Sequence, residues 1–271
     1  MTARRLHFHV NSGKPEAEAA HGELSGVVAS LGMEECARGS DADVVVALGG
    51  DGTILRAVHR HPAKPVLGLN LGGLGYLSTV ERSGFSKAMS LLAEGRFRIS
   101  TRTMLSVSKA GSGEPAATAL NDVVVVREMT GHAAVLDVSV DGRAATRYMA
   151  DGLVVATPTG STAYSLAAGG PVLMPDSASF VVTPMNPHAL GIRPIVVSDG
   201  VSVTVVPRPR DNGRSEKIGV YADGENAFML GCDESLVVAK AGQRAAIVEL
   251  DGYDPYEVLA RKLGWSGGVA R

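Results

Sequence analysis

The sequence predicts an α/β N-terminal domain with a doubly wound parallel sheet, an all-β sandwich-like C-terminal domain, and a C-terminal helix that returns to the first domain. Two patterns support this prediction. Over roughly the first hundred residues, apolar runs of strand type alternate with segments of helical spacing, as in βαβ units with right-handed crossovers. From about Phe97, short β-rich runs follow one another with turns between them, as in antiparallel sandwiches.

The length of 271 residues is sufficient for two ordinary domains, each with its own core. We expect residues 1–98 and 250–271 to form the α/β domain and residues 99–249 to form the β-rich domain. In a doubly wound sheet, ligands collect at the carboxyl ends of the strands.

In the first domain, strands are expected at residues 6–10, 44–48 and 66–69, where aliphatic side chains run together. Helices are indicated by apolar residues at helical spacing that stop near a glycine. One of these helices carries Leu24, Val27, Val28 and Leu31 before Gly32; another carries Phe85, Met89 and Leu92 before Gly95.

In the second domain, the expected strands are short β-rich runs at residues 123–126, 136–140, 153–156, 201–206 and 236–239. Asp141-Gly142 is a hairpin signal, and Asp223-Gly224 is a candidate for another. Residues 208–217 are expected to form an exposed loop. After Asp254-Pro255, a final helix is expected from Tyr256, Leu259 and Leu263, which share one helical face.

Composition excludes several classes of protein. The net charge of −2 offers no basic surface for nucleic acid, and no stretch approaches the length of a membrane-spanning helix. Cys36 and Cys232 lie far apart with no secretory signal before them, which favours reduced thiols in a cytoplasmic protein. The histidines at 7, 9, 59 and 61 are interpreted as packed or solvated side chains, and no metal site is predicted.

The glycine-rich segment Gly49-Gly50-Asp51-Gly52-Thr53 stands between a buried strand and a helix that begins near Ile54, with Thr53 near the N-cap. Such a turn presents backbone N–H groups at the positive end of the helix dipole, which suits phosphate oxygens. A carboxylate there makes chemical sense if Asp51 accepts a proton from a hydroxyl that attacks a phosphate. The alternative is an ordinary Asp-Gly turn.

Two further segments are candidates for nucleotide binding. Residues 151–165 run from a buried strand into a turn crowded with Thr and Ser hydroxyls, followed by a short helix in which Tyr164 offers a ring for stacking. An ordinary Ser/Thr capping turn is the alternative. Asn121-Asp122, at a strand entrance, can chelate the two adjacent hydroxyls of a ribose, but the dipeptide taken alone favours a structural turn.

Taken jointly and in this order, these segments resemble the NAD kinase family. Further segments agree, namely residues 70–77, residues 184–190 with Arg193-Pro194, and Lys262-Leu263-Gly264-Trp265. The glycine-rich segment alone is shared with diacylglycerol, sphingosine and phosphofructokinase families, whereas residues 151–171 are specific. The resemblance covers residues 43–265.

The resemblance implies that Asp51 is the catalytic base for the 2′-hydroxyl of the adenosine ribose of NAD. It implies a phosphate loop of Gly49, Gly50 and Thr53. The β-rich domain would bind the dinucleotide. The implied NAD-binding residues are Asp51, Gly52, Asn121, Asp122, Asp151, Thr162, Ala163, Tyr164, Ser165, Leu166 and Ala167.

Several positions depart from the family pattern and are weaker candidates. The ribose-binding pair usually ends in Glu, and here it ends in the shorter Asp122. A basic residue often stands two before Asp151, where this chain has Met149, with Arg147 two further back. The remaining candidates are His132, Asn186, which can face a neighbouring subunit's nicotinamide, and Glu225, where Gln is common.

The resemblance implies NAD and ATP as substrates, Mg²⁺ carried with ATP, and a homodimer or homotetramer. No P-loop lysine motif is present, so the cation has to supply more of the positive charge. Two alternatives are a lipid or sugar kinase with the same glycine loop, against which residues 151–171 argue, and a non-catalytic dinucleotide-binding regulator.

Overall fold

The computed structural model describes residues 2–11, 13–72, 75–78, 80–128, 132–210 and 217–265. It divides the chain into two compact units, residues 1–101 with 245–271, and residues 102–244. Most of the loop expected at 208–217, and residues 73 and 74 of the segment 70–77, lie outside the described residues.

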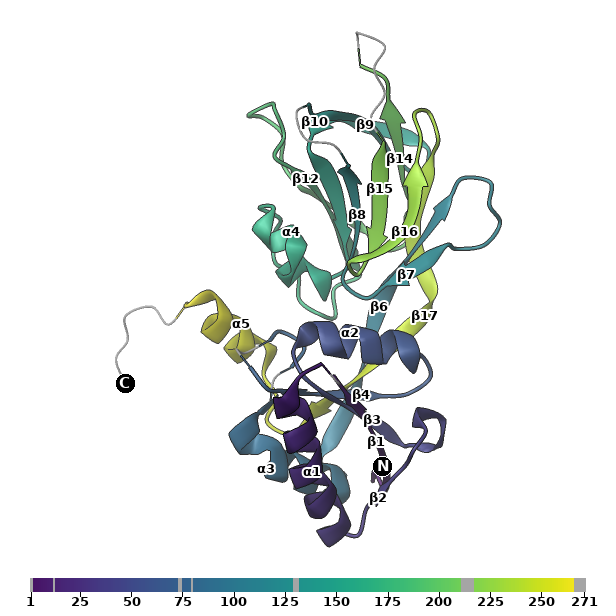
Figure 1. Ribbon diagram of the computed structural model, residues 1–271. Helices are drawn as coiled ribbons and strands as arrows, with labels where there is room; N and C mark the ends of the chain where they lie inside the picture. The colour runs from purple at the N-terminus through teal and green to yellow at the C-terminus, as the bar shows by residue number, and fades with distance from the viewer. Residues whose placement is uncertain are drawn as a thin grey trace. The chain divides into compact units, whose positions relative to one another are not determined.

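The first unit is built on parallel strands in the order β2-β1-β3-β4 (Figure 1), with β5 and the end of β17 also paired to β4. The strands that lie wholly in this unit are β1 (Arg5–Val10), β2 (Glu34–Glu35), β3 (Val44–Leu48), β4 (Val66–Asn70) and β5 (Val80–Glu81). Every residue of β3 and β4 is buried. Burial on both faces explains the unbroken apolar runs from which these strands were predicted.

Four α-helices accompany this sheet in the described residues, namely α1 (Pro15–Ser30), α2 (Asp51–Arg60), α3 (Phe85–Glu94) and α5 (Pro255–Leu263). Two 3₁₀ turns, η1 (Gly39–Asp41) and η2 (Arg82–Gly84), complete the unit. Helices α1 and α3 share one core with the sheet, in which Leu24 and Val28 meet Met89 and Leu92. Figure 1 shows these two helices on one side of the strands and α2 on the other. Helix α3 ends at Gly95, whose φ of 73° is the left-handed conformation of a glycine C-cap.

The second unit is all-β apart from α4 (Tyr164–Ala167) and η3 (Gly160–Thr162). One sheet has the order β10-β9-β14-β17-β6-β7, and the other β13-β12-β11-β8-β15-β16. The strands are β6 (Phe97–Lys109), β7 (Ala117–Ala119), β8 (Asp122–Arg127), β9 (Ala134–Val140), β10 (Arg143–Ala150), β11 (Gly152–Ala156), β12 (Ser179–Met185), β13 (Ile195–Ser198), β14 (Val203–Arg208), β15 (Ile218–Ala222), β16 (Glu225–Leu230) and β17 (Leu236–Leu250).

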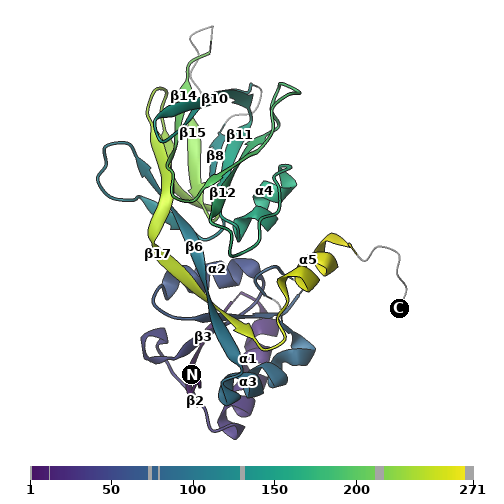
Figure 2. The same ribbon diagram turned by 180° about the vertical axis from the view of Figure 1, so that it is seen from behind.

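The core of the second unit lies between its two sheets and includes Phe180, the largest fully buried side chain among the described residues. On the outer face of the second sheet, α4 covers a smaller apolar cluster around Val154 and Met185. Figure 2 shows α4 beside β11 and β12. Strands β6 and β17 each pass from one unit to the other.

The predicted fold class is confirmed: an α/β unit with a parallel sheet, a sandwich-like β unit, and a final helix that belongs to the first unit. Both predicted hairpins are present, with positive φ at Asp141 and Gly142 between β9 and β10, and at Asp223 and Gly224 between β15 and β16. Two adjacent residues with positive φ are the requirement of a type I′ turn.

Two local predictions were wrong. The N-cap of α2 is Gly50, and Thr53 lies inside the first turn with its side chain packed beneath Gly49. Arg208 was expected in a solvated loop, but it ends β14 and pairs with Asp137 and Asp233. Both carboxylates come from segments distant in the sequence, so composition around Arg208 gave no sign of them.

Within the described ranges, the structure contains no helix long and apolar enough to cross a lipid bilayer.

The N-cap of α5 provides a test of local stability. The Asp254 carboxylate accepts a hydrogen bond from the Tyr256 N–H at 2.8 Å, and Pro255 occupies the first helical position. Replacing a capping Asp by Ala typically costs about 1 kcal/mol. We expect Asp254→Ala to lower the urea midpoint of the first unit accordingly. Asp254→Asn, which retains a capping oxygen, is the control, and equal loss in both variants would contradict the assignment.

Candidate active site

The glycine-rich segment joins the carboxyl end of β3 to the start of α2. Gly49 allows a close approach, because a Cβ at this position would overlap the Thr53 hydroxyl. Thr53 is buried, and its hydroxyl accepts a hydrogen bond from Arg56 at 3.3 Å. The first turn of a helix leaves its N–H groups without intrahelical partners. This loop therefore presents backbone donors at the positive end of α2.

Asp51 is the first residue of α2, and its carboxylate is bound by the segment that follows β4. Oδ1 accepts hydrogen bonds from Leu77 N–H at 3.2 Å, Ser78 N–H at 3.1 Å and the Ser78 hydroxyl at 3.0 Å. Oδ2 accepts one, from Tyr76 N–H at 2.8 Å. A carboxylate oxygen has about two lone pairs, so Oδ2 retains the capacity to accept another proton or hydrogen bond.

This arrangement requires a glycine at position 75. A Cβ at Gly75 would overlap both the Asp51 carboxylate and the Ser78 hydroxyl. Ser78 itself is fully buried. Burial, together with the nearby charge of Asp51, raises the pKa of Tyr76. The Lys262 ammonium of α5 lies 5.3 Å from the centre of the Tyr76 ring, which is within the range of a cation–π contact.

In the second unit, the predicted segments at 121–122 and 157–160 meet at one end of the second sheet. Antiparallel pairing sets Ala156, at the end of β11, opposite Asp122, at the start of β8. Asn121 O accepts from Thr157 N–H at 2.9 Å, and a Cβ at Gly160 would overlap that same carbonyl. The Asn121 side-chain oxygen is buried and has no hydrogen-bond partner among the described residues. A ligand donor would satisfy it.

Asp223 fixes the conformation of this turn, a role that the sequence did not indicate beyond a hairpin signal. Its carboxylate accepts three backbone hydrogen bonds, from Leu120 N–H at 2.7 Å, Asn121 N–H at 2.8 Å and Asp122 N–H at 3.2 Å. Its own N–H donates to Asp122 O at 3.0 Å. Three converging donors compensate a carboxylate at this position.

Asp122 lies beside this carboxylate and is itself buried. Burial, reinforced by the negative charge of Asp223, raises the pKa of Asp122 to about 7. At neutral pH its carboxyl group is therefore close to half protonated and can either donate or accept a hydrogen bond.

Asp151 lies at the opposite end of β11. Its Oδ1 accepts from Arg127 at 2.6 and 2.9 Å, and its Oδ2 from the Asn186 amide at 3.0 Å. The hydrogen bond from Asn186 and the Arg127 guanidinium lower the pKa of Asp151. Arg127 was not predicted as a site residue. In the sequence, Arg127 is distinguished only as the basic residue that follows the apolar run at 123–126.

The five residues of β11 separate the two polar ends of the sheet. At the usual rise of a strand, Asp151 and the Asn121–Asp122 turn are about 17 Å apart. Between them, on the outer face of the sheet, Ser165 of α4 hydrogen-bonds the Thr183 hydroxyl at 2.9 Å. The Tyr164 ring is 46% exposed. The other predicted residues follow the same turn, namely Thr162, Ala163, Leu166 and Ala167.

The weaker candidates are dispersed. Arg147 pairs with Asp137, whose pKa it lowers, with help from Arg208, to about 2, so its guanidinium is already engaged. Met149 is 43% exposed on β10. His132 and Glu225 are exposed. Among these candidates, Asn186 is the one that contacts another predicted site residue, Asp151.

Three of the histidines, His7, His9 and His61, form a packed group. The His61 ring lies 5.1 Å from His7 and 5.8 Å from His9, measured between ring centres. Burial and the neighbouring His61 lower the pKa of His9 to about 4, so it is neutral at physiological pH. In the described part of the chain, no group of three or more His, Cys, Asp or Glu side chains is arranged to hold a metal ion.

A strand–glycine loop–helix that carries a carboxylate, joined to a β unit with polar strand ends, defines a nucleotide-dependent phosphotransferase of two domains. The ATP-NAD kinase N-terminal domain matches residues 11–97, and the ATP-NAD kinase C-terminal domain matches residues 120–250. The chain belongs to the NAD kinase family, whose reaction transfers a phosphoryl group from ATP to NAD to give NADP.

Curated relatives agree. The NAD kinase of Protochlamydia amoebophila is 38% identical over 224 residues, which are 82% of this chain and 78% of that protein. The NAD kinase of Symbiobacterium thermophilum is 39% identical over 227 residues, 82% of this chain and 79% of that protein. The NAD kinase of Chlorobium limicola is 35% identical over 94% of each chain.

Two solved structures share the fold at 24% sequence identity. Yeast NADH kinase complexed with NADH superposes with a TM-score of 0.86 over 99% of this chain and 89% of that one. An NAD kinase from Archaeoglobus fulgidus in complex with ATP gives a TM-score of 0.79 over 97% of this chain and 99% of that one.

The raised pKa of Asp122 predicts a pH-dependent stability. Its carboxyl group binds a proton more tightly in the folded chain, with a pKa of about 7, than in the unfolded chain, where the ordinary value is 3.8. The stability gained from that proton is therefore full below about pH 4 and is lost as the pH rises to 7. Asp122→Asn should remove this loss, and so gain stability over the wild type by up to roughly 1.4 kcal/mol per pH unit in that window.

Urea unfolding of both proteins between pH 4.5 and 7.5 measures this difference. The exposed Asp176, replaced in Asp176→Asn, is the matched control. Parallel pH profiles for Asp122→Asn and the wild type would show that Asp122 titrates normally.

Proposed function

We propose that this chain transfers the γ-phosphate of ATP to the 2′-hydroxyl of the adenosine ribose of NAD, with Asp51 as the general base. The observation that carries the proposal is the geometry of the Asp51 carboxylate. Three donors hold Oδ1 and a single one binds Oδ2, so one oxygen anchors the group and the other has a free lone pair.

The chemistry requires such a group. As the bond between the ribose oxygen and the γ-phosphorus forms, the bond from that phosphorus to the β,γ-bridging oxygen breaks, and ADP leaves. The hydroxyl proton passes to Asp51 Oδ2. A positioned carboxylate makes the ribose hydroxyl a competent nucleophile at neutral pH. The N–H groups of Gly50 and Gly52 at the start of α2 stabilise the negative charge of the transferring phosphoryl group, whereas the Gly49 N–H donates to Leu69 O at 3.0 Å and belongs to the sheet.

The second unit binds the dinucleotide in this proposal. Ribose hydroxyls would supply the donor that the buried Asn121 side-chain oxygen lacks among the described residues, and the half-protonated Asp122 can donate in return. Tyr164 offers an exposed ring on which a base can stack. The roughly 17 Å from this turn to Asp151 is comparable with the length of an extended dinucleotide.

Mg²⁺ enters with ATP and neutralises phosphate charge when bound. Mg²⁺ is usually held by substrate phosphates and one or two carboxylates rather than by a cage of protein ligands.

We also propose a cytoplasmic location and a homodimer or homotetramer. Both cysteines, Cys36 and Cys232, are free thiols, as expected in a reducing compartment. In the second unit, Leu190 is 95% exposed, and Val196 is half exposed on the edge strand β13. Exposed apolar side chains beside a strand edge favour association with another copy.

The role of Asp51 is tested by Asp51→Asn. Asn keeps an oxygen for the N–H groups of residues 77 and 78 but cannot take a proton, so kcat should fall by about 100- to 10,000-fold. The dissociation constant for NAD, measured by calorimetry, should change little. Asp41→Asn, at an exposed carboxylate outside the loop, is the control. A kcat within threefold of wild type would disprove the assignment.

The role of the Asn121 side chain is tested by Asn121→Ala. Because its oxygen has no partner in the described structure, its removal should leave the urea midpoint unchanged or raise it. The KM for NAD should increase about three- to tenfold, the equivalent of one hydrogen bond. Asn226→Ala, on the exposed face of β16, is the matched control. A lower urea midpoint with an unchanged KM would assign Asn121 a structural role instead.

A further inference from the structure

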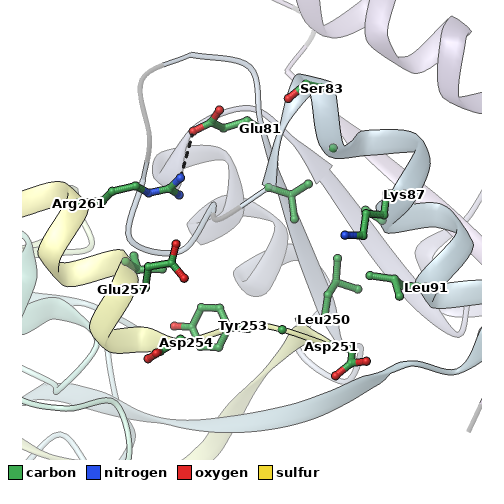
Figure 3. Close-up of a pocket in the computed structure, with 15 residues that line it drawn as sticks. Glu81, Ser83, Lys87, Leu91, Leu250, Asp251, Tyr253, Asp254, Glu257 and Arg261 are labelled. Atoms are coloured by element: carbon green, nitrogen blue, oxygen red, sulfur yellow. Dashed lines mark ion pairs between the residues drawn. The ribbon is translucent and has the colours of Figure 1, made fainter. Parts of the chain in front are cut away.

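The first unit contains a pocket of about 340 Å³ between α3 and α5, closed at its base by the turn after β17. Figure 3 shows its lining. This volume lies at the lower end of the range for small-molecule sites. None of its lining residues belongs to the glycine loop or to residues 75–78. The pocket is thus separate from the phosphate loop, although both are in the same unit.

The lining combines an apolar floor with two opposite charges. The floor consists of aliphatic side chains, namely Val80, Ala88, Leu91, Leu250 and Val258. In Figure 3, Lys87 on α3 and Glu257 on α5 stand on opposite sides, with their charged ends toward the middle.

These two charges differ from the other charged groups of the lining. Glu81 is paired with Arg261, Asp251 with Arg96, and Asp254 caps α5. Among the described residues, neither Lys87 nor Glu257 has an ion-pair or hydrogen-bond partner, and both side chains are exposed.

We propose that this pocket binds a small zwitterion of the amino-acid class with an apolar side chain. Its carboxylate would pair with Lys87, its ammonium with Glu257, and its side chain would cover the aliphatic floor. A molecule with only one of these charges would pair with only one of the two protein groups. The arrangement of charges therefore selects for both.

The pocket is connected to the segment that holds Asp51 through two elements. Strand β5 contributes Val80 and Glu81 to the lining and begins two residues after Ser78. Helix α5 contacts that region twice, through the Arg261–Glu81 ion pair at 3.7 Å and through Lys262 over the Tyr76 ring. A ligand that moved α3 and α5 closer together would change the contacts that α5 makes with Tyr76 and Glu81, next to the segment 76–78. This second part of the inference rests on the proposed role of Asp51, whereas binding itself does not.

The binding test uses the full chain without nucleotides. Leucine, 4-methylpentanoate (no ammonium) and 3-methylbutylamine (no carboxylate) are titrated by saturation-transfer NMR. Leucine should bind about two- to fivefold more tightly than either analogue, because both protein charges are exposed. Lys87→Met and Glu257→Gln should each weaken leucine binding by a similar factor, while Glu18→Gln, an exposed carboxylate on α1, should not. Equal affinity for the three probes, or no binding, would overturn the proposal.

Coupling is measured separately by hydrogen exchange. Leucine should change the exchange of the Tyr76, Leu77 and Ser78 amides, and Glu257→Gln should need a higher leucine concentration than the wild type for the same change. Unchanged exchange at these amides would overturn the coupling. Because neither measurement uses NAD, ATP or turnover, failure here is distinguishable from failure of Asp51 as the base.

Discussion

The contact between the Asp51 carboxylate and the backbone of residues 76–78 is the constraint on which the first unit depends. Parallel pairing sets Leu48 of β3 level with Leu69 of β4. The segments that leave these two strands therefore reach the same edge of the sheet. Asp51 lies after the end of β3, and residues 75–78 lie after the end of β4. Gly75 is needed because any side chain there would occupy the space of the carboxylate, and α5 supports the segment from the outside through Lys262.

In the second unit, the ends of antiparallel strands likewise meet at one edge of a sheet. The end of β11, the start of β8 and the end of β15 are neighbours at one edge. There the Asp223 carboxylate accepts hydrogen bonds from the N–H groups of residues 120–122. The turn in the first unit leads instead into a helix N-terminus, which presents N–H donors. In both units a carboxylate fixes the backbone of a turn and a polar group keeps capacity for a ligand: Asp51 Oδ2 accepts a single hydrogen bond, from Tyr76 N–H, and the Asn121 side-chain oxygen has no partner among the described residues.

The sequence predicted well those helices, strands and turns that depend on interactions between residues close together in the chain. Apolar runs predicted β3 and β4, glycine predicted the end of α3, and Asp-Gly pairs predicted both hairpins. It did not predict contacts that depend on register. Arg127 reaches Asp151 because Val126 pairs with Gly152 across two strands, and nothing near Arg127 in the chain indicates that pairing. Likewise, the segment that binds Asp51 lies more than twenty residues away in the chain, so the donors to its carboxylate could not be inferred.

Three aspartates illustrate how surroundings decide the chemistry of one residue type. Asp151, bound by Asn186 and Arg127, has a lowered pKa and remains an anion. Asp122, buried beside another carboxylate, has a pKa of about 7 and carries a proton part of the time. Asp51 is oriented by backbone donors that leave one oxygen available. The residue at 122 and the turn at 223 therefore set the proton affinity of this end of the sheet together.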